Sequence, residues 1–274
     1  MSKRAKFGLV AFLLSVGLWL ISFVPVEGRL TFYIVASVLA YVLTAWVIFE
    51  DLKGVEWISL LILPVMFVLG AGLFSYYLPV LIPSVVGLEF DLGVATLIGS
   101  GIRLLYFILV GLSLYAILLT ENIFSVASVR SIALLRAARS VGFIMTLIAG
   151  LFFFHTILSL KLAFWSIGIL VFAVSFLLGF QGLWSVDLKT ENMREKTKLS
   201  LVCAFLMGQL GMVVAFWPAT VFLGALVLAS GLYALLGLFQ QRLGNRVFLG
   251  NFLEYIIFSL VVVVITFLMT SWRG

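Results

Sequence analysis

The sequence consists of long apolar runs separated by short charged connections. At about 1.5 Å per residue, a helix of roughly 20 residues crosses a hydrocarbon core about 30 Å thick. The runs lack the alternating segments of about 10 residues that barrel strands show. The sequence therefore predicts an all-α, polytopic transmembrane helix bundle of about nine spans (eight to ten). The expected spans are 7–24, 31–49, 56–78, 103–120, 141–160, 162–183, 199–217, 219–239 and 248–270.

The composition excludes a water-soluble globule. Hydrophobic residues make up 64% of the 274 positions and charged residues only 10%, whereas soluble domains are about half apolar and about a quarter charged. No connection is long enough for a self-supporting soluble domain, so we expect residues 1–274 to form a single integral membrane domain. With one Cys and one His, neither a disulfide framework nor a Cys/His metal cluster can form. We expect no cofactor.

The distribution of basic residues predicts the orientation of the chain. With the amino terminus in the cytoplasm, 13 of the 17 Lys and Arg residues fall on the cytoplasmic side, which is the bias that orients membrane proteins. A tenth span over 79–102 would destroy this bias. The net charge of +6 is thereby explained without nucleic acid, which we do not expect as a partner. The first run lacks an A-x-A cleavage pattern, so we expect it to stay as a helix. The outer side receives Arg29, Arg103, Lys161 and Arg273.

The connection 79–102 is apolar but interrupted by proline and glycine. One interpretation is a re-entrant or interfacial lid, with Glu89 and Asp91 facing an outer site beside Arg103. The simpler interpretation is a hairpin or short helix on the outer leaflet, with both carboxylates in water. Two acids at i and i+2 are common in any loop, and this favours the simpler interpretation.

Four polar side chains within the predicted spans are candidates for a functional role. Glu254 lies about 10 Å into the last helix, where an unpaired carboxylate is costly, and Asn251 precedes it on the same face. Glu254 could bind a proton or cation, or could pair with Arg242 or Arg246. His155 and Gln209 are expected to make polar contacts between helices, and a midplane substrate site at Gln209 is the alternative.

The connection 121–140 combines apolar residues with Glu121, Asn122, Arg130, Arg136 and Arg139. Wound as a helix, it does not gather its arginines on one face, so the amphipathic signal is weak. The segment still suits an interfacial helix whose three arginines contact anionic lipid headgroups.

The segment Thr120-Glu121-Asn122-Ile123-Phe124-Ser125-Val126-Ala127-Ser128, followed by Leu134-Leu135-Arg136-Ala137-Ala138, resembles an uncharacterised group of multi-pass inner-membrane proteins of candidate-phyla bacteria. The resemblance covers about 20 residues. It implies a location in the bacterial cytoplasmic membrane and implies no activity.

Signatures of membrane enzymes are missing: the sequence has no G-x-S-x-G nucleophile with a His partner, no H-E-x-x-H and no P-loop. We therefore expect a non-catalytic scaffold, partner subunit or lipid-interacting bundle. Its partners would be membrane lipids and possible membrane proteins, and its oligomeric state is left open. The first alternative is a small-molecule or ion transporter that uses Glu254, Asn251 and Gln209. The second is a membrane-embedded transferase with an outer site at Glu89, Asp91 and Arg103.

Overall fold

The computed structural model describes residues 2–49, 54, 56–80, 82, 84–85, 88–89, 91–127, 134–188, 192–244 and 249–271. Within these ranges nine helices are long and apolar enough to cross a membrane, which confirms the predicted all-α polytopic bundle. Their bounds are α1 Lys3–Ile21, α2 Val26–Ile48, α3 Glu56–Phe74, α4 Leu92–Ala127, α5 Leu135–Ser159, α6 Phe164–Trp184, α7 Met193–Ala215, α8 Val221–Leu243 and α9 Leu249–Met269.

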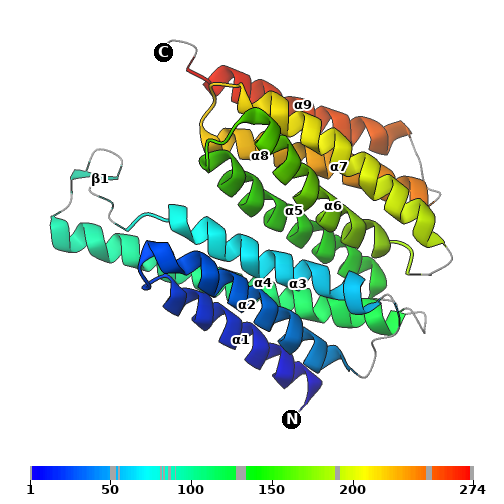
Figure 1. Cartoon of the computed structure of the whole chain (residues 1–274), viewed down its shortest axis with the longest axis horizontal. Helices are drawn as coiled ribbons and strands as arrows, with labels where there is room; N and C mark the ends of the chain where they lie inside the picture. The colour runs from blue at the N-terminus through cyan, green and yellow to red at the C-terminus, as the bar shows by residue number, and fades with distance from the viewer. Residues whose placement is uncertain are drawn as a thin grey trace.

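The helices lie side by side with their axes roughly aligned, and the two chain termini lie at opposite ends of the bundle (Figure 1). Helices α1 to α4 form one part of the molecule and α5 to α9 the other. The two parts meet where α3 and α4 pack against α5, and α3 also contacts α6. Helix α9 lies at one edge and packs on α8.

The sequence sets the helix boundaries in recognisable ways. The Ser2 hydroxyl accepts a hydrogen bond from the Ala5 amide at 3.3 Å and caps α1, and Thr220 caps α8 in the same way after Pro218. Such caps satisfy amide groups that have no partner inside the helix. Pro64 lies inside α3, which continues through it.

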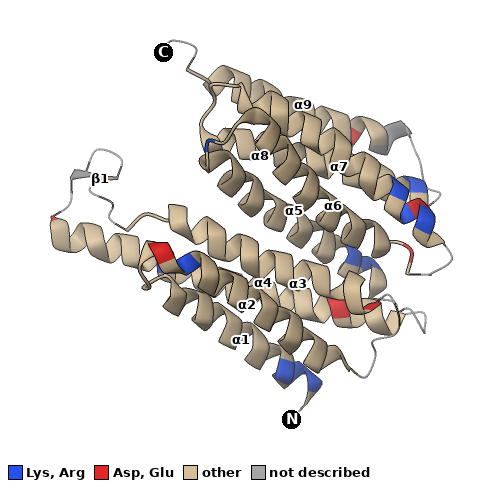
Figure 2. Ribbon diagram, in the orientation of Figure 1, with Lys and Arg blue, Asp and Glu red and all other residues tan. Residues whose placement is uncertain are grey.

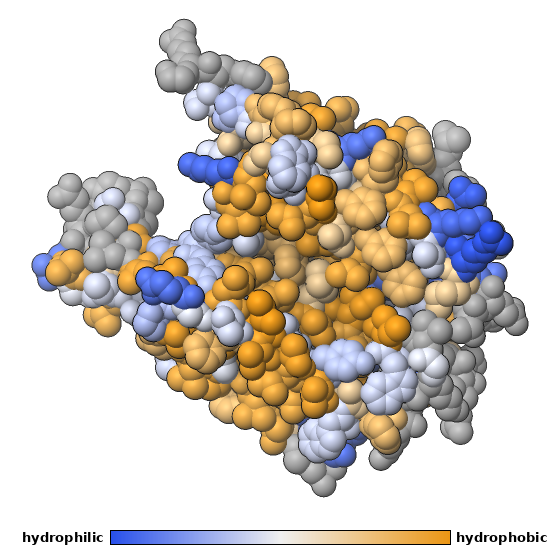
Figure 3. All heavy atoms as spheres, viewed as in Figure 1, coloured by the Kyte–Doolittle hydropathy of each residue, from blue (hydrophilic) through white to orange (hydrophobic). Residues whose placement is uncertain are grey.

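The sides of the bundle, parallel to the helix axes, are apolar, and its two ends are charged. Large apolar side chains are exposed on every long helix, and one face is broadly hydrophobic in Figure 3. Lys and Arg gather at the end where α1 begins, here called the basic end (Figure 2). The opposite end is called the far end. The described basic-end residues are Lys3, Arg4, Lys6, Arg136, Arg139, Arg194, Lys196, Lys198 and Arg242.

Helix α4 differs most from its prediction, because it runs over Leu92–Ala127 instead of 103–120. Its 36 residues correspond to about 54 Å, well beyond a hydrocarbon core of about 30 Å. At the far end α4 extends beyond its neighbours (Figure 1). It is preceded by the 3-10 turn η2 (Ser75–Tyr77) and an antiparallel pair of two-residue strands, β1 (Ser84–Val85) and β2 (Leu88–Glu89). The strand pair is the hairpin element of the simpler interpretation, whereas residues 92–102 belong to α4 and not to a connection.

Candidate functional site

The extension of α4 at the basic end brings Glu121 into the bundle. The side chain is fully buried, at 0% exposure. Ile117, Leu118 and Phe124 are buried on the same helix, and positions three and four residues apart share a helix face. The prediction that placed Glu121 in an interfacial connection is therefore wrong: the residue occupies the core-facing stripe of a long helix.

Glu121 belongs to a chain of buried polar groups that joins three helices. The Gln181 side chain on α6 donates from Nε2 to Glu121 Oε1 at 2.9 Å. Thr146 Oγ1 on α5 lies 3.3 Å from Gln181 Oε1 and donates to the Gly142 carbonyl at 2.8 Å. Glu121 Oε2 has no hydrogen-bond partner within the described part of the chain. We call Glu121, Gln181 and Thr146 the Glu121 triad.

The basic end of α6 is held by side chains from two further positions. Arg139 on α5 donates from Nε to the Ser185 carbonyl at 3.2 Å and from Nη2 to the Val186 carbonyl at 2.6 Å. Gln240 on α8 donates to the Gly182 carbonyl at 2.9 Å. The last carbonyl groups of a helix have no backbone partner within it. The Ser185 and Val186 carbonyl groups, just after α6, gain donors from α5, and the Gly182 carbonyl accepts from Gln240 as well as from the Ser185 hydroxyl at 2.7 Å.

Lys196 forms an ion pair with Asp187 at this end. Its side chain is fully buried on α7, and its ammonium lies 3.4 Å from Asp187 Oδ2 and also bonds the Asp187 carbonyl. The pair ties the start of α7 to the connection that follows α6. Replacement of Asp187 by a neutral residue would remove a carboxylate partner from a fully buried ammonium, which is destabilising.

The Glu121 triad offers a carboxyl, an amide and a hydroxyl in an apolar surrounding. A buried carboxyl with one free oxygen can hold a proton or a small cation, and ionisable groups inside membrane helices are functional candidates by default. Among the described residues, no group of three or more His, Cys, Asp or Glu could hold a metal ion. The chemistry available is proton or cation exchange.

The structure does not bring the predicted transport residues together. Gln209 is exposed on α7 and Glu254 is exposed on α9, and the two helices are not in substantial contact. The side chain of Asn251 lies outside the described set. The neighbours of Gln209 do pack as predicted: Gly208 faces the Gly168 carbonyl of α6 and Gly211 faces Val171. Glu254 lies within electrostatic range of Tyr233.

His155 lies in an aromatic surrounding near the far end of α5. Its ring packs edge-on against Phe74 and Tyr77, with centroids 5.0 and 4.9 Å apart, and against Phe222 at 6.4 Å. Its Nδ1 is buried without a hydrogen-bond partner in the described ranges. His155 thus joins α3, η2, α5 and α8.

The outer residues Glu89, Asp91 and Arg103 are separated. The backbone of Glu89 is in β2, and its side chain is not among those described. Asp91 is exposed, and its carboxylate accepts from the Gly93 amide at 3.4 Å. Arg103 lies 12 positions further along, about 18 Å down the helix.

The three arginines expected to contact anionic lipid differ in their surroundings. Arg130 falls outside the described residues. Arg136 is exposed at the basic end, where a lipid headgroup could reach it. Arg139 donates from Nε and Nη2 to the end of α6, and its contact with anionic lipid stays a prediction.

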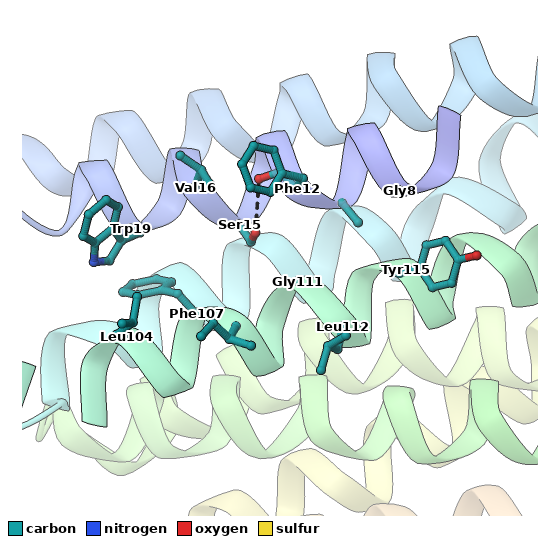
Figure 4. A pocket seen from close by; sticks show the side chains of 12 residues that line it. Gly8, Phe12, Ser15, Val16, Trp19, Leu104, Phe107, Gly111, Leu112 and Tyr115 are labelled. Atoms are coloured by element: carbon teal, nitrogen blue, oxygen red, sulfur yellow. Dashed lines mark hydrogen bonds between the residues drawn. The ribbon is translucent and has the colours of Figure 1, made fainter. Parts of the chain in front are cut away.

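A groove runs between α1 and α4 on the surface of the bundle (Figure 4). It has a volume of about 470 Å³. Gly8, Phe12 and Trp19 of α1 line one side and Leu112 and Tyr115 of α4 the other, with Trp19 and Tyr115 near opposite ends (Figure 4). A Cβ placed on Gly8 would meet nothing within 4 Å, so this glycine borders open space. The remaining lining residues are Ala11, Ser15, Val16, Leu104, Phe107, Ile108 and Gly111.

The sequence-based prediction missed Glu121 because it ended the fourth span at residue 120. The signal was present: Ile117, Leu118, Glu121, Phe124 and Ser125 continue the helical spacing of the buried face. Comparison with protein-family models, curated proteins and solved structures finds no match for this chain.

Proposed function

We propose that this integral membrane protein is a non-catalytic, lipid-interacting bundle that holds one acyl chain of a membrane lipid in the groove between α1 and α4. The single observation behind the proposal is the groove itself: it lies between two apolar helices, and its rim residues Phe12 and Leu112 are 65% and 62% exposed. Its volume is within the range of small-molecule sites, about 300–1,000 Å³.

The length and chemistry of the groove fit an acyl chain. Gly8 and Trp19 are 11 positions apart on α1, which corresponds to about 16 Å, close to the roughly 15 Å of one leaflet's hydrocarbon. The Ser15 hydroxyl donates a hydrogen bond to the Phe12 carbonyl at 3.1 Å, so it does not need a polar partner from the bound molecule.

A matched pair of glycine substitutions on α1 tests this proposal. Gly8→Leu would fill the groove, whereas Gly17→Leu places the same side chain elsewhere on the same helix. A Cβ at either position meets nothing within 4 Å, so both variants should fold. Native mass spectrometry of the detergent-purified proteins should show a retained phospholipid for the wild type and Gly17→Leu and loss of it for Gly8→Leu.

Equal lipid retention in all three proteins would contradict the proposal. A second copy of the chain seated in the groove would contradict it too. In that case Gly8→Leu would convert a dimer to a monomer, and the wild-type dimer would contain no lipid at this position.

We also propose the bacterial cytoplasmic membrane as the location, with the basic end in the cytoplasm. The gathering of Lys and Arg at one end supports this orientation. Reporter fusions at the two termini should give opposite signals, and identical signals would contradict the orientation.

Proton-coupled or cation-coupled transport is the second candidate, and the Glu121 triad is the observation that favours it. In proteoliposomes, a transporter would lose ion-driven uptake when Glu121 is replaced by Gln, because the amide cannot exchange a proton. If wild-type proteoliposomes move neither protons nor monovalent cations, the transport function is excluded and the lipid-interacting proposal stands.

A further inference from the structure

The side chain of Gln209 lies on the outer surface of α7, in the middle of a membrane-spanning segment. The charged residues at the start of α7 end with Lys198, and an uninterrupted apolar run follows from Leu199 to the amide. Gln209 is ten positions after Leu199, which corresponds to about 15 Å, half of a hydrocarbon core of about 30 Å. Because the side chain is exposed, its amide is presented at the depth of the lipid tails.

The Gln209 amide makes no hydrogen bond within the part of the chain that the structure describes. An amide carries two N–H donors and a carbonyl acceptor, and lipid tails offer a partner to neither. Leaving such groups unpaired in an apolar medium is costly. A long lysine or arginine side chain near a helix end can reach the headgroups, but a glutamine at a depth of about 15 Å cannot. The exposed amide therefore indicates a partner from outside this copy of the chain.

The inner face of α7 is already occupied by the fold of the monomer. Among the described helices, α7 packs mainly on α6 and α8. A Cβ on Gly208 would lie 3.0 Å from the Gly168 carbonyl oxygen, and a Cβ on Gly211 would lie 3.0 Å from the Val171 side chain. This close packing leaves no room for Gln209 to turn inwards, so its partner must approach from the lipid side.

The exposed residues around Gln209 have the spacing of a helix–helix interface. Five exposed positions alternate by four and three residues, and Gln209 is the middle one. We call them the α7 seam: Val202, Leu206, Gln209, Val213 and Phe216. Two helices with this heptad spacing pack side by side at a small crossing angle. A single polar residue in such a seam fixes the register and the number of helices.

A second copy of this chain supplies what the amide lacks. All copies insert in the same orientation, so each carries Gln209 at the same depth. A two-fold axis along the membrane normal brings two α7 seams face to face, and each amide then donates an N–H to the carbonyl of the other. A different membrane protein would need its own polar side chain at this depth. We infer that the α7 seam is the interface of a homodimer in which the two Gln209 side chains hydrogen-bond to each other.

This interface is independent of the lipid proposed for the groove. Helix α7 belongs to the part of the bundle formed by α5 to α9, whereas α1 and α4, which line the groove, belong to the other part (Figure 1). A substitution in one place can therefore leave the other unchanged.

Energy transfer between donor-labelled and acceptor-labelled copies of the full chain measures the dimer in vesicles of phosphatidylcholine and phosphatidylglycerol. For the wild type, transfer should rise linearly with the acceptor fraction, as for two copies. Gln209→Leu should raise the dissociation constant about threefold to thirtyfold, the effect of a polar contact between membrane helices. Gln209→Asn keeps an amide and should raise it less. Glu254→Leu, at an exposed polar position on α9, and Gly8→Leu, in the groove, are the controls and should leave it unchanged.

Cysteine cross-linking in the same vesicles tests the geometry in chains that retain Gln209. The native Cys203 is buried, so it should not link two copies. Leu206→Cys and Val213→Cys place thiols in the α7 seam and should form a covalent dimer when copper phenanthroline is added. Leu201→Cys is the matched control: Leu201 is also exposed on α7 but lies about 140° around the helix from Leu206, so this variant should stay monomeric.

Absence of energy transfer in the wild type at every protein-to-lipid ratio overturns the inference, because lipid or another protein then covers α7. An unchanged dissociation constant in Gln209→Leu overturns it as well. A dimer that Gly8→Leu dissociates has its interface at the groove, with the same consequence. Equal cross-linking at the three cysteine positions indicates random collision and also contradicts the α7 seam. If size exclusion shows that Gln209→Leu fails to fold, the cross-linking arm decides.

Discussion

Gln181 donates a hydrogen bond of 2.9 Å to Glu121, a residue 60 positions earlier on a different helix. The contact joins α4 of one part of the bundle to α6 of the other. Since both side chains are fully or almost fully buried, no water competes for the bond. This hydrogen bond makes the Glu121 triad a link between the two parts of the bundle as well as a candidate site for a proton or cation. Substitutions at Glu121 can therefore separate an effect on stability from an effect on ion binding.

Glu121→Leu should lower the free energy of unfolding by about 1–3 kcal/mol, because the Gln181 amide loses its acceptor in a buried place. Glu121→Gln keeps a carbonyl acceptor there and should remain within about 1 kcal/mol of the wild type. Unfolding by titration with a denaturing detergent measures both. Glu254→Leu, at an exposed position, is the control and should cost nothing; a fully stable Glu121→Leu would show that the link does not hold the bundle together.

Gly72→Ala should destabilise the junction of α2 and α3. A Cβ at this position would lie 2.7 Å from the ring of Tyr33, and the bond to Ser75 keeps that ring in place. Overpacking of this kind costs about 1–3 kcal/mol. The melting temperature in detergent reports the loss. Gly101→Ala, where a Cβ meets nothing within 4 Å, should melt no lower than the wild type.

Gly208→Leu should separate α6 from α7. A Cβ on Gly208 would lie 3.0 Å from the Gly168 carbonyl oxygen, and a backbone atom cannot move aside as a side chain can. The expected loss is about 1–3 kcal/mol. The adjacent Gln209→Leu is exposed and should be tolerated. Thermal unfolding of the two variants side by side makes the comparison, and equal stability would argue against close packing here.

Arg139→Met should loosen the basic end of α6, because the Ser185 and Val186 carbonyl groups lose their donors. The cost is about 1–3 kcal/mol for leaving such groups unpaired. Hydrogen exchange should accelerate in residues 181–186 and remain unchanged in α1. Arg136→Met replaces an exposed arginine three positions earlier on α5. This variant should leave the hydrogen exchange of α6 unaltered.

The spans were predictable because the bilayer imposes a length on any crossing helix, and apolar runs of that length are visible without knowledge of contacts. The ends of α4 were not predicted. Glu121 interrupts the apolar run, and a count of hydropathy treats a carboxylate as the end of a span, although the helical spacing of the apolar residues continues past it. Its hydrogen-bond partner Gln181 lies 60 positions away, and no local pattern identifies such a partner.

Gln209 illustrates the opposite error. Its small neighbours Gly208 and Gly211 do pack against α6, but Gln209 itself is turned outwards by the helical rotation of about 100° per residue. The small residues in the sequence indicated a close helix contact here, but the sequence did not show which side chain points towards α6.

Helix α9 is attached to the rest of the bundle mainly through α8. A chain ending after Gly244 would lose this interface and also the hydrogen bond that Trp217 Nε1 donates to Thr270 Oγ1 at 3.0 Å. Because α8 ends at the basic end, where α1 begins, such a chain would have both its ends at that end of the bundle and would lack the helix that returns to the far end (Figure 1).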